Sequence, residues 1–195
     1  MKKKILSNNK GFSLIELIVA VLIIAIISGG AIVGFGALFS NKMTAAATNV
    51  QDALKQARVD GLGMENKYDD TTKRTGIYAK FYMSGSNVYV DVCMRNSSAD
   101  PEVLHTRKVS DSGYGLEMWK SGASTAVASV GTSDIYVYYK KSTGAVSSIY
   151  KVNAGQDVSS GTQIDANILR VVGPGADAQQ DVILVTVTGR AFVDS

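Results

Sequence analysis

Hydrophobic and polar positions divide the chain into stretches with different periods. From Phe12 an apolar run of 28 residues reaches Phe39 and contains one charged residue, Glu16. This run exceeds the roughly 20 residues that an α-helix needs to cross a bilayer. The pattern therefore predicts a transmembrane helix over residues 12–39.

The apolar positions that follow recur every three or four residues, as they do on one face of a helix. They are Met43, Ala46, Ala47, Val50, Leu54, Ala57 and Gly61. Charged and amide side chains occupy much of the remaining surface, and Gly61 and Gly63 provide a C-terminal stop. We expect the same helix to continue as an amphipathic segment over 40–64 and to pack on a folded domain.

Beyond Asp70 the period changes to two, which is typical of half-buried β-strands. Residues 77–83 and 88–94 alternate on either side of a turn and predict a hairpin. Two further hairpins are expected, between 135–139 and 146–152 and between 182–187 and 190–193, and a strand over 168–172 is expected beside the second of them. Shorter strands are expected at 103–109 and 115–119, and a loop of small residues over 121–133. One long helix followed by antiparallel strands predicts an α+β fold, with a globular domain over 65–195.

The charge of the chain is concentrated at its start. The sequence pI is about 8.9, but four lysines precede Phe12 and that stretch contains no acidic residue. Without them, 16 basic residues remain against 17 acidic ones, a formal charge of −1. Lysines on this side of an apolar run hold the N-terminus in the cytoplasm.

Three kinds of N-terminal segment are compatible with this pattern. A cleaved secretory signal would use Leu17–Ile27 as its apolar core and end near Ser28–Ala31, but apolar character resumes after that point. An uncut anchor could hold a surface receptor or enzyme domain, but it gives no reason for Glu16. A carboxylate near the end of an apolar helix is unfavourable in lipid and usually has a functional role with a partner cation.

The third kind rests on a resemblance. The residues Lys10-Gly11-Phe12-Ser13-Leu14-Ile15-Glu16-Leu17 resemble the class III leader of type IV prepilins and pseudopilins. The resemblance implies that residues 1–11 are a leader peptide and that a prepilin peptidase cuts between Gly11 and Phe12 and methylates the new Phe12 amine. It also implies that Glu16 pairs with the Phe12 amine of a neighbouring subunit during assembly, and that the domain has the pilin fold.

The resemblance further implies a function without catalysis. The chain would be a structural subunit, a minor pilin or pseudopilin, of a type IV pilus-like filament. Its partners would be other pilin subunits, the prepilin peptidase, a membrane assembly platform protein and, before assembly, membrane lipid. It would cross the cytoplasmic membrane once, with its N-terminus in the cytoplasm, and then enter an extracellular or periplasmic filament.

Two shorter patches resemble the minor pseudopilins and minor pilins grouped as GspH and FimT. They are Tyr136–Tyr139 through Gly144–Ser147, and Val185–Arg190. Some FimT-type pilins bind DNA in natural transformation through a basic motif that begins Gly-Arg, and Arg190 is the matching candidate here. The expected second basic residue is missing and the mature charge is near zero, so we favour a turn or edge-strand role for Arg190 and expect no nucleic-acid partner.

The remaining chemistry-bearing residues support neither an enzyme nor a cofactor. One histidine, His105, and one cysteine, Cys93, cannot build a zinc cluster or an internal disulfide, and no nucleophile motif accompanies them. We expect His105 to be an exposed strand residue and Cys93 a packed thiol. Asp177 and Asp181 could bind calcium, but their spacing matches no defined calcium loop and favours a solvated turn.

Overall fold

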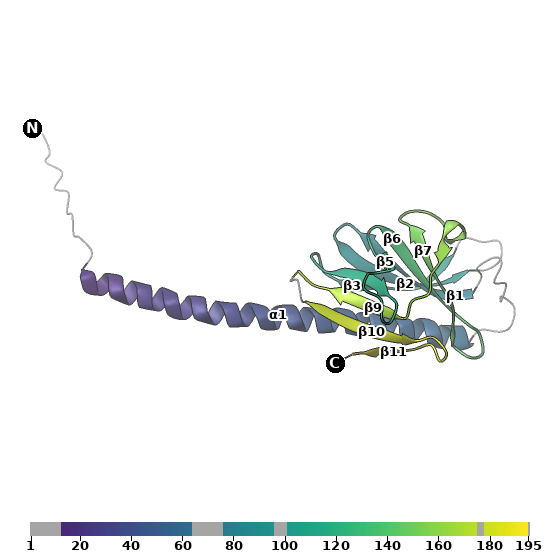
Figure 1. The fold of residues 1–195 in the computed structure, drawn as a ribbon, viewed down its shortest axis with the longest axis horizontal. Coiled ribbons are helices and arrows are strands. Elements are labelled where there is room, and N and C mark those ends of the chain that lie inside the picture. The colour runs from purple at the N-terminus through teal and green to yellow at the C-terminus, as the bar shows by residue number, and fades with distance from the viewer. Residues whose placement is uncertain (1–12, 64–75, 96–100, 175–177, 195) are drawn as a thin grey trace, which may run out of the picture. The chain divides into compact units, whose positions relative to one another are not determined.

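The computed structural model contains one long helix. It describes residues 13–63, 76–95, 101–174 and 178–194, apart from the side chains of residues 29–37. Helix α1 runs from Leu14 to Gly63, so the predicted continuation of the helix beyond residue 39 is confirmed (Figure 1). The chain divides into two units, Met1–Phe39 and Ser40–Ser195.

In the first unit, the described side chains of α1 are exposed along its whole circumference. Leu14 and Ile26, for example, retain 78% and 68% of their accessible surface. Among the described residues, no helix is both long and apolar enough to cross a membrane. The apolar run predicted from the sequence includes Phe12 and residues 29–37, which lie outside the described side chains.

Among its described residues, the second unit contains two β-sheets, and the strands within each sheet pair antiparallel. The six-stranded sheet has the order β3-β2-β1-β6-β7-β8, with β1 Gly76–Ser84, β2 Asn87–Arg95, β3 Glu102–Ser110, β6 Ser133–Tyr139, β7 Val146–Asn153 and β8 Thr162–Gln163. The five-stranded sheet has the order β11-β10-β9-β4-β5, with β4 Gly115–Trp119, β5 Ala128–Ser129, β9 Ile168–Val172, β10 Gln179–Val185 and β11 Arg190–Val193. A 3-10 helix, η2, spans Val158–Ser160. The predicted α+β fold is confirmed.

The core of this unit lies between the helix and the inner faces of both sheets. The small and branched residues of the predicted helical stripe, such as Ala47 and Leu54, are fully buried. They share one hydrophobic cluster with Phe81 of the six-stranded sheet and with Leu116 and Leu169 of the five-stranded sheet. Each large apolar side chain buried in this way contributes about 1.5–3 kcal/mol of transfer free energy. Packing against two sheets therefore fixes the helix from residue 40 onward.

Most strand predictions hold, and the exceptions have physical causes. The three predicted hairpins form, but β10 ends at Val185 because the following residues make the turn into β11. The prediction of a loop over residues 121–133 was wrong in part. Ala128 and Ser129 form β5 by pairing with Met118 and Glu117 of β4. Two residues are too few for an alternating pattern, so only tertiary pairing reveals them.

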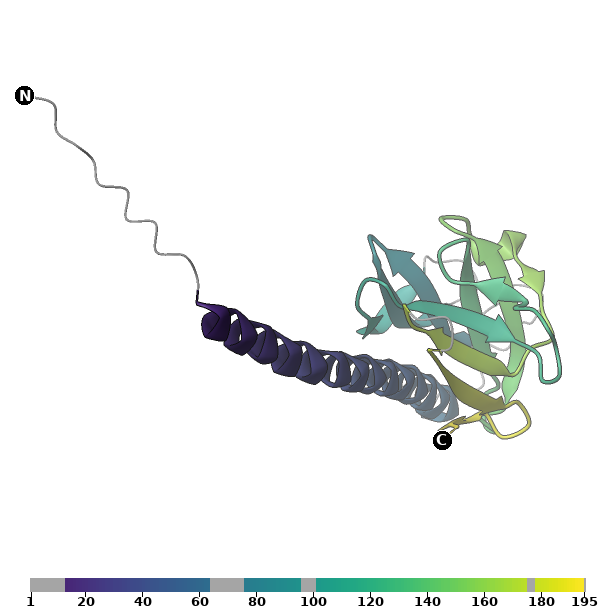
Figure 2. The same ribbon diagram turned by 60° about the vertical axis from the view of Figure 1, so that its left-hand side comes forward.

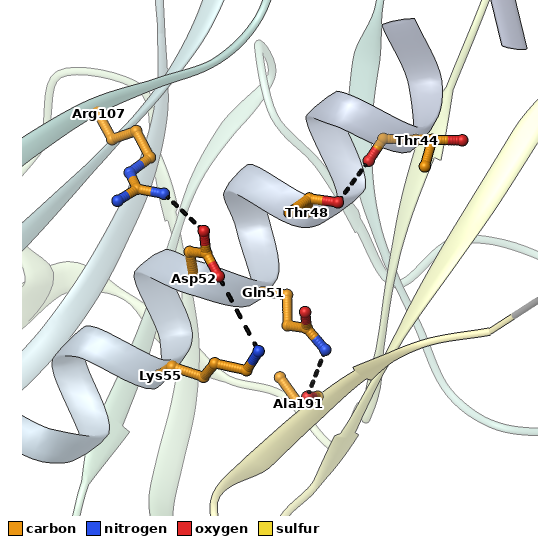
Figure 3. Close-up of polar contacts among 7 residues, drawn as sticks. All are labelled: Thr44, Thr48, Gln51, Asp52, Lys55, Arg107 and Ala191. Carbon is orange, nitrogen blue, oxygen red and sulfur yellow. Dashed lines mark hydrogen bonds and ion pairs between the residues drawn. The ribbon is translucent and has the colours of Figure 1, made fainter. Parts of the chain in front are cut away.

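Polar side chains of α1 attach it to one strand of each sheet (Figure 3). The Gln51 side chain donates a hydrogen bond of 2.9 Å to the Ala191 carbonyl oxygen in β11. On the other side, Asp52 forms ion pairs with Arg107 of β3 at 3.1 Å and with Lys55 of its own helix at 3.9 Å. Figures 1 and 2 both show β10 and β11 running beside this part of the helix. The sequence pattern places Gln51, Asp52 and Lys55 on the polar surface of the helix but does not predict their partners in the sheets.

Candidate assembly site at the start of the helix

Ser13 and Glu16 form a reciprocal cap at the start of α1. The Ser13 backbone N–H donates to Glu16 Oε2 at 3.0 Å, and the Ile15 backbone N–H donates to Ser13 Oγ at 3.4 Å. This is a capping box, in which a Ser at the N-cap and a Glu three residues later each satisfy a free backbone donor of the first turn. The negative charge of Glu16 also lies where the positive end of the helix dipole stabilises it. The sequence analysis missed this role, although the Ser-x-x-Glu spacing is a known signal for it.

The surroundings of Glu16 are otherwise apolar. Its side chain borders a shallow groove on the helix surface that is lined by Ile15, Val19, Ala20 and Ile23. Glu16 is the one charged side chain between Ser13 and Ser28. Glu16 is therefore a lone negative charge on an apolar helix surface. Gly11 and Phe12, the predicted cleavage and methylation residues, lie outside the described residues.

The two patches that resemble GspH and FimT proteins meet in the second unit. The turn after β6 contains Gly144, the turn after β10 contains Gly189, and the backbone of Gly189 lies directly against the Gly144 carbonyl oxygen. Beside them, the Val146 N–H donates to the Thr186 carbonyl oxygen at 2.8 Å, which joins the two sheets. Arg58 of α1 donates through Nε to the Thr188 carbonyl oxygen, also at 2.8 Å. Sequence reasoning identified both patches but not their contact, and it missed Arg58.

Arg190 and Asp181, the candidate residues for DNA and calcium, both lie in the five-stranded sheet. Arg190 is exposed at the start of β11, opposite Val185, and DNA contact at this residue stays a prediction. Asp181 in β10 accepts a bidentate pair of hydrogen bonds from Arg170, at 2.7 and 2.9 Å. Within the described part of the chain, no group of three or more His, Cys, Asp or Glu side chains could hold a metal ion. The calcium hypothesis also depends on Asp177, which lies outside the described residues, and it stays a prediction.

The single histidine and the single cysteine are located as predicted. The His105 side chain on β3 is 55% exposed, and its Nε2 lies 3.5 Å from Asp60 Oδ2. Cys93 on β2 is 3% exposed and packs with Tyr78 and Tyr138 on the face of the six-stranded sheet opposite the main core. Burial, with a smaller contribution from the Asp91 charge, raises the pKa of the Cys93 thiol to about 11.

We predict that Cys93 resists alkylation in the folded chain. With a thiol pKa of about 11, roughly one thiol in a thousand is ionised near pH 8, and only the thiolate reacts. The alkylation rate with iodoacetamide should rise about tenfold per pH unit between roughly pH 8 and 10, as measured by intact mass. The denatured chain provides the control, because its exposed thiol should react at once. Equal rates for the folded and denatured chains would contradict the burial of Cys93.

Comparison with known proteins connects this geometry to a family. An N-terminal helix packed on antiparallel sheets is consistent with the pilin fold. Residues 6–32 match the family model described as the prokaryotic N-terminal methylation motif. The chain therefore carries the class III leader of type IV prepilins and pseudopilins, and the match supports a type IV pilin-like subunit. No curated protein and no solved structure matches the chain.

The motif is the signal for prepilin peptidase cleavage and methylation, and it includes Gly11, Phe12 and Glu16. Proteins of the type IV pilin family are structural rather than enzymatic. A leader of this class implies membrane anchoring before assembly into pilin filaments.

Proposed function

We propose that the chain is a minor pilin or pseudopilin, of the group that includes GspH and FimT, and that it is built into a type IV pilus-like filament. The match of residues 6–32 to the methylation motif carries this proposal. The position of Glu16 in the first turn of an apolar helix supports it, because that is where an assembly carboxylate is needed. The contact between the Gly144 and Gly189 turns brings together the two patches that suggest the subgroup.

In this proposal each segment has its own task. Residues 1–11 are the leader on the cytoplasmic side, and residues 12–39 cross the cytoplasmic membrane once before assembly. Residues 40–64 continue the helix and carry the domain of residues 65–195. Prepilin peptidase cuts between Gly11 and Phe12 and methylates the new amine, after which the helix leaves the lipid for the core of the filament.

Charge neutralisation then explains how a new subunit finds its position. A lone carboxylate at the bilayer centre is unfavourable by about 2.5–3.5 kcal/mol, and the cost falls toward the surface. The ammonium group of a neighbouring Phe12 is an equally unfavourable cation, so pairing it with Glu16 relieves both. Because the two charges have one favourable distance, the pair also sets the axial position of one helix relative to the next. A membrane assembly platform protein and neighbouring pilin subunits are the partners in this step.

The N-terminal mass of the native protein tests the proposal. We expect the chain extracted from membranes to begin at an N-methylated Phe12, as shown by mass spectrometry of its N-terminal peptide. An intact Met1 would favour an anchored receptor or enzyme domain, and a start near Ser28–Ala31 would indicate an ordinary secretory signal. A strain that lacks prepilin peptidase is the control, because the full leader should then remain.

A further inference from the structure

A cavity of about 260 Å³ lies on the face of the six-stranded sheet that points away from α1. Along β1, Ile77, Ala79 and Phe81 enter the main core, so the intervening Tyr78 and Lys80 point to the opposite face. There they line the cavity, which also borders β2, β3, β6, η2 and the turn before η2. None of its lining residues belongs to the start of the helix or to the Gly144 and Gly189 turns.

The polar groups around this cavity are held in place by partners. Lys80 Nζ lies 3.2 Å from Asp134 Oδ2, and Arg95 Nη1 lies 3.1 Å from Asp157 Oδ2. Asp157 also accepts a 2.8 Å hydrogen bond from the Ser159 backbone N–H, which, with the nearby Arg95 charge, keeps the pKa of Asp157 below its ordinary value. Each of these groups has hydrogen-bonding capacity left, because an ammonium carries three donors, a guanidinium five, and a carboxylate about four acceptor positions.

Charge decides which class of ligand fits. The lining contains two cations, Lys80 and Arg95, and two carboxylates, Asp91 and Asp157, and Lys80 is also paired with Asp134, so the site has no net positive charge. A phosphate or a nucleic acid would gain no net attraction there, and an apolar ligand would leave four charged groups without water. Hydroxyl groups both donate and accept, so an uncharged polyhydroxyl ligand can pair with cations and carboxylates together.

The aromatic lining and the volume of the cavity narrow this class further. Tyr78 and Tyr136 are the aromatic residues of the lining, with ring centroids 5.5 Å apart and planes tilted by 44°. Aromatic rings pack against the C–H faces of sugar rings while polar groups bind the hydroxyls. The volume is below the roughly 300–1,000 Å³ of sites for drug-sized ligands, which favours a single ring over a longer chain.

We propose that this cavity binds one uncharged monosaccharide unit, free or at the end of a glycan. The contacts that carry the proposal involve only the second unit and do not depend on filament assembly. If the proposed function holds as well, the helix lies toward the filament core. The sugar site, on the opposite face of the sheet, then points outward.

Saturation-transfer NMR on the full-length chain in a sugar-free detergent tests the proposal. The probes are glucose, galactose and N-acetylglucosamine, with inorganic phosphate as the charged comparison. We expect at least one sugar to bind with a Kd of about 1 mM and to slow alkylation of Cys93, which lines the cavity. Absence of binding by all three sugars, or stronger binding of phosphate, would overturn the proposal.

Two rim variants and a matched control locate the binding. Asp157→Asn and Arg95→Gln should each weaken sugar binding about tenfold, because each removes a charged hydrogen-bonding partner. Asparagine still caps η2, so the first variant keeps the fold. Arg107→Gln breaks an ion pair between β3 of the same sheet and α1, outside the cavity, and should change binding less than twofold. Equal effects of all three variants on sugar binding would place the sugar elsewhere. The N-terminal mass, which tests the proposed function, does not depend on whether the sugar binds.

Discussion

Replacing Glu16 with glutamine is expected to reduce incorporation into filaments at least about 100-fold while leaving cleavage of the leader intact. Glutamine keeps the oxygen that accepts the Ser13 N–H, since a capping box works with Glu or Gln. It loses the charge, so the Phe12 ammonium of a neighbouring subunit would be buried without a partner. Leaving one member of a buried ion pair alone is unfavourable by about 3–5 kcal/mol, which corresponds to this factor or more.

The measurement is the ratio of the chain in sheared filaments to the chain in membranes, together with the N-terminal mass of the membrane fraction. Ser13→Ala is the matched control, because it removes the Oγ that accepts the Ile15 N–H but keeps the Glu16 charge. Its effect on incorporation should stay within about fivefold, in line with the loss of one cap. Equal losses for Ser13→Ala and Glu16→Gln would show that capping, and not charge, is what assembly requires.

Local signals made this end of the molecule predictable. The apolar run and the period of three to four residues predicted the helix, which forms over Leu14–Gly63. The capping box was also readable, because Ser13 and Glu16 lie within one turn of each other. The sequence-based prediction gave Glu16 only an intermolecular partner. It missed the hydrogen bond from the Ser13 N–H, which forms within one chain.

Long-range contacts account for what the sequence did not predict. Alternation predicted that β1 would be half-buried, yet Tyr78 on its outer face is 2% exposed because it packs in a cluster with Tyr136, Tyr138 and Val158. The period of two identifies the two faces of a strand but not what covers the second face. The sugar cavity was unpredictable for the same reason, since its lining residues come from β1, β2, β3, β6, η2 and the turn before η2.

Replacing Gly189 with alanine is expected to destabilise the second unit by about 2–5 kcal/mol. Gly189 has a φ of 66°, and a Cβ there would overlap the Gly144 carbonyl oxygen and lie 3.2 Å from Tyr139 Cε1. The left-handed backbone alone disfavours alanine by about 1–2 kcal/mol, and overpacking adds about 1–3 kcal/mol. The carbonyl belongs to the backbone and cannot rotate away as a side chain would. Thermal melting followed by circular dichroism should therefore show a fall in Tm of roughly 10 °C.

Alanine variants of two other glycines are controls that separate the effect of backbone strain from the effect of the contact with Gly144. Gly85 has a φ of 61° but no atom within 4 Å of an added Cβ, so Gly85→Ala should lose only the roughly 1–2 kcal/mol of the backbone term. Gly115 has neither a positive φ nor a close neighbour, and Gly115→Ala should melt with the native chain. If Gly189→Ala melts with Gly85→Ala, the two turns do not pack as described. If Gly189→Ala melts well below Gly85→Ala, any loss of function in Gly189 variants reflects folding. Arg190→Ala changes an exposed side chain, so its effect reports on DNA binding alone.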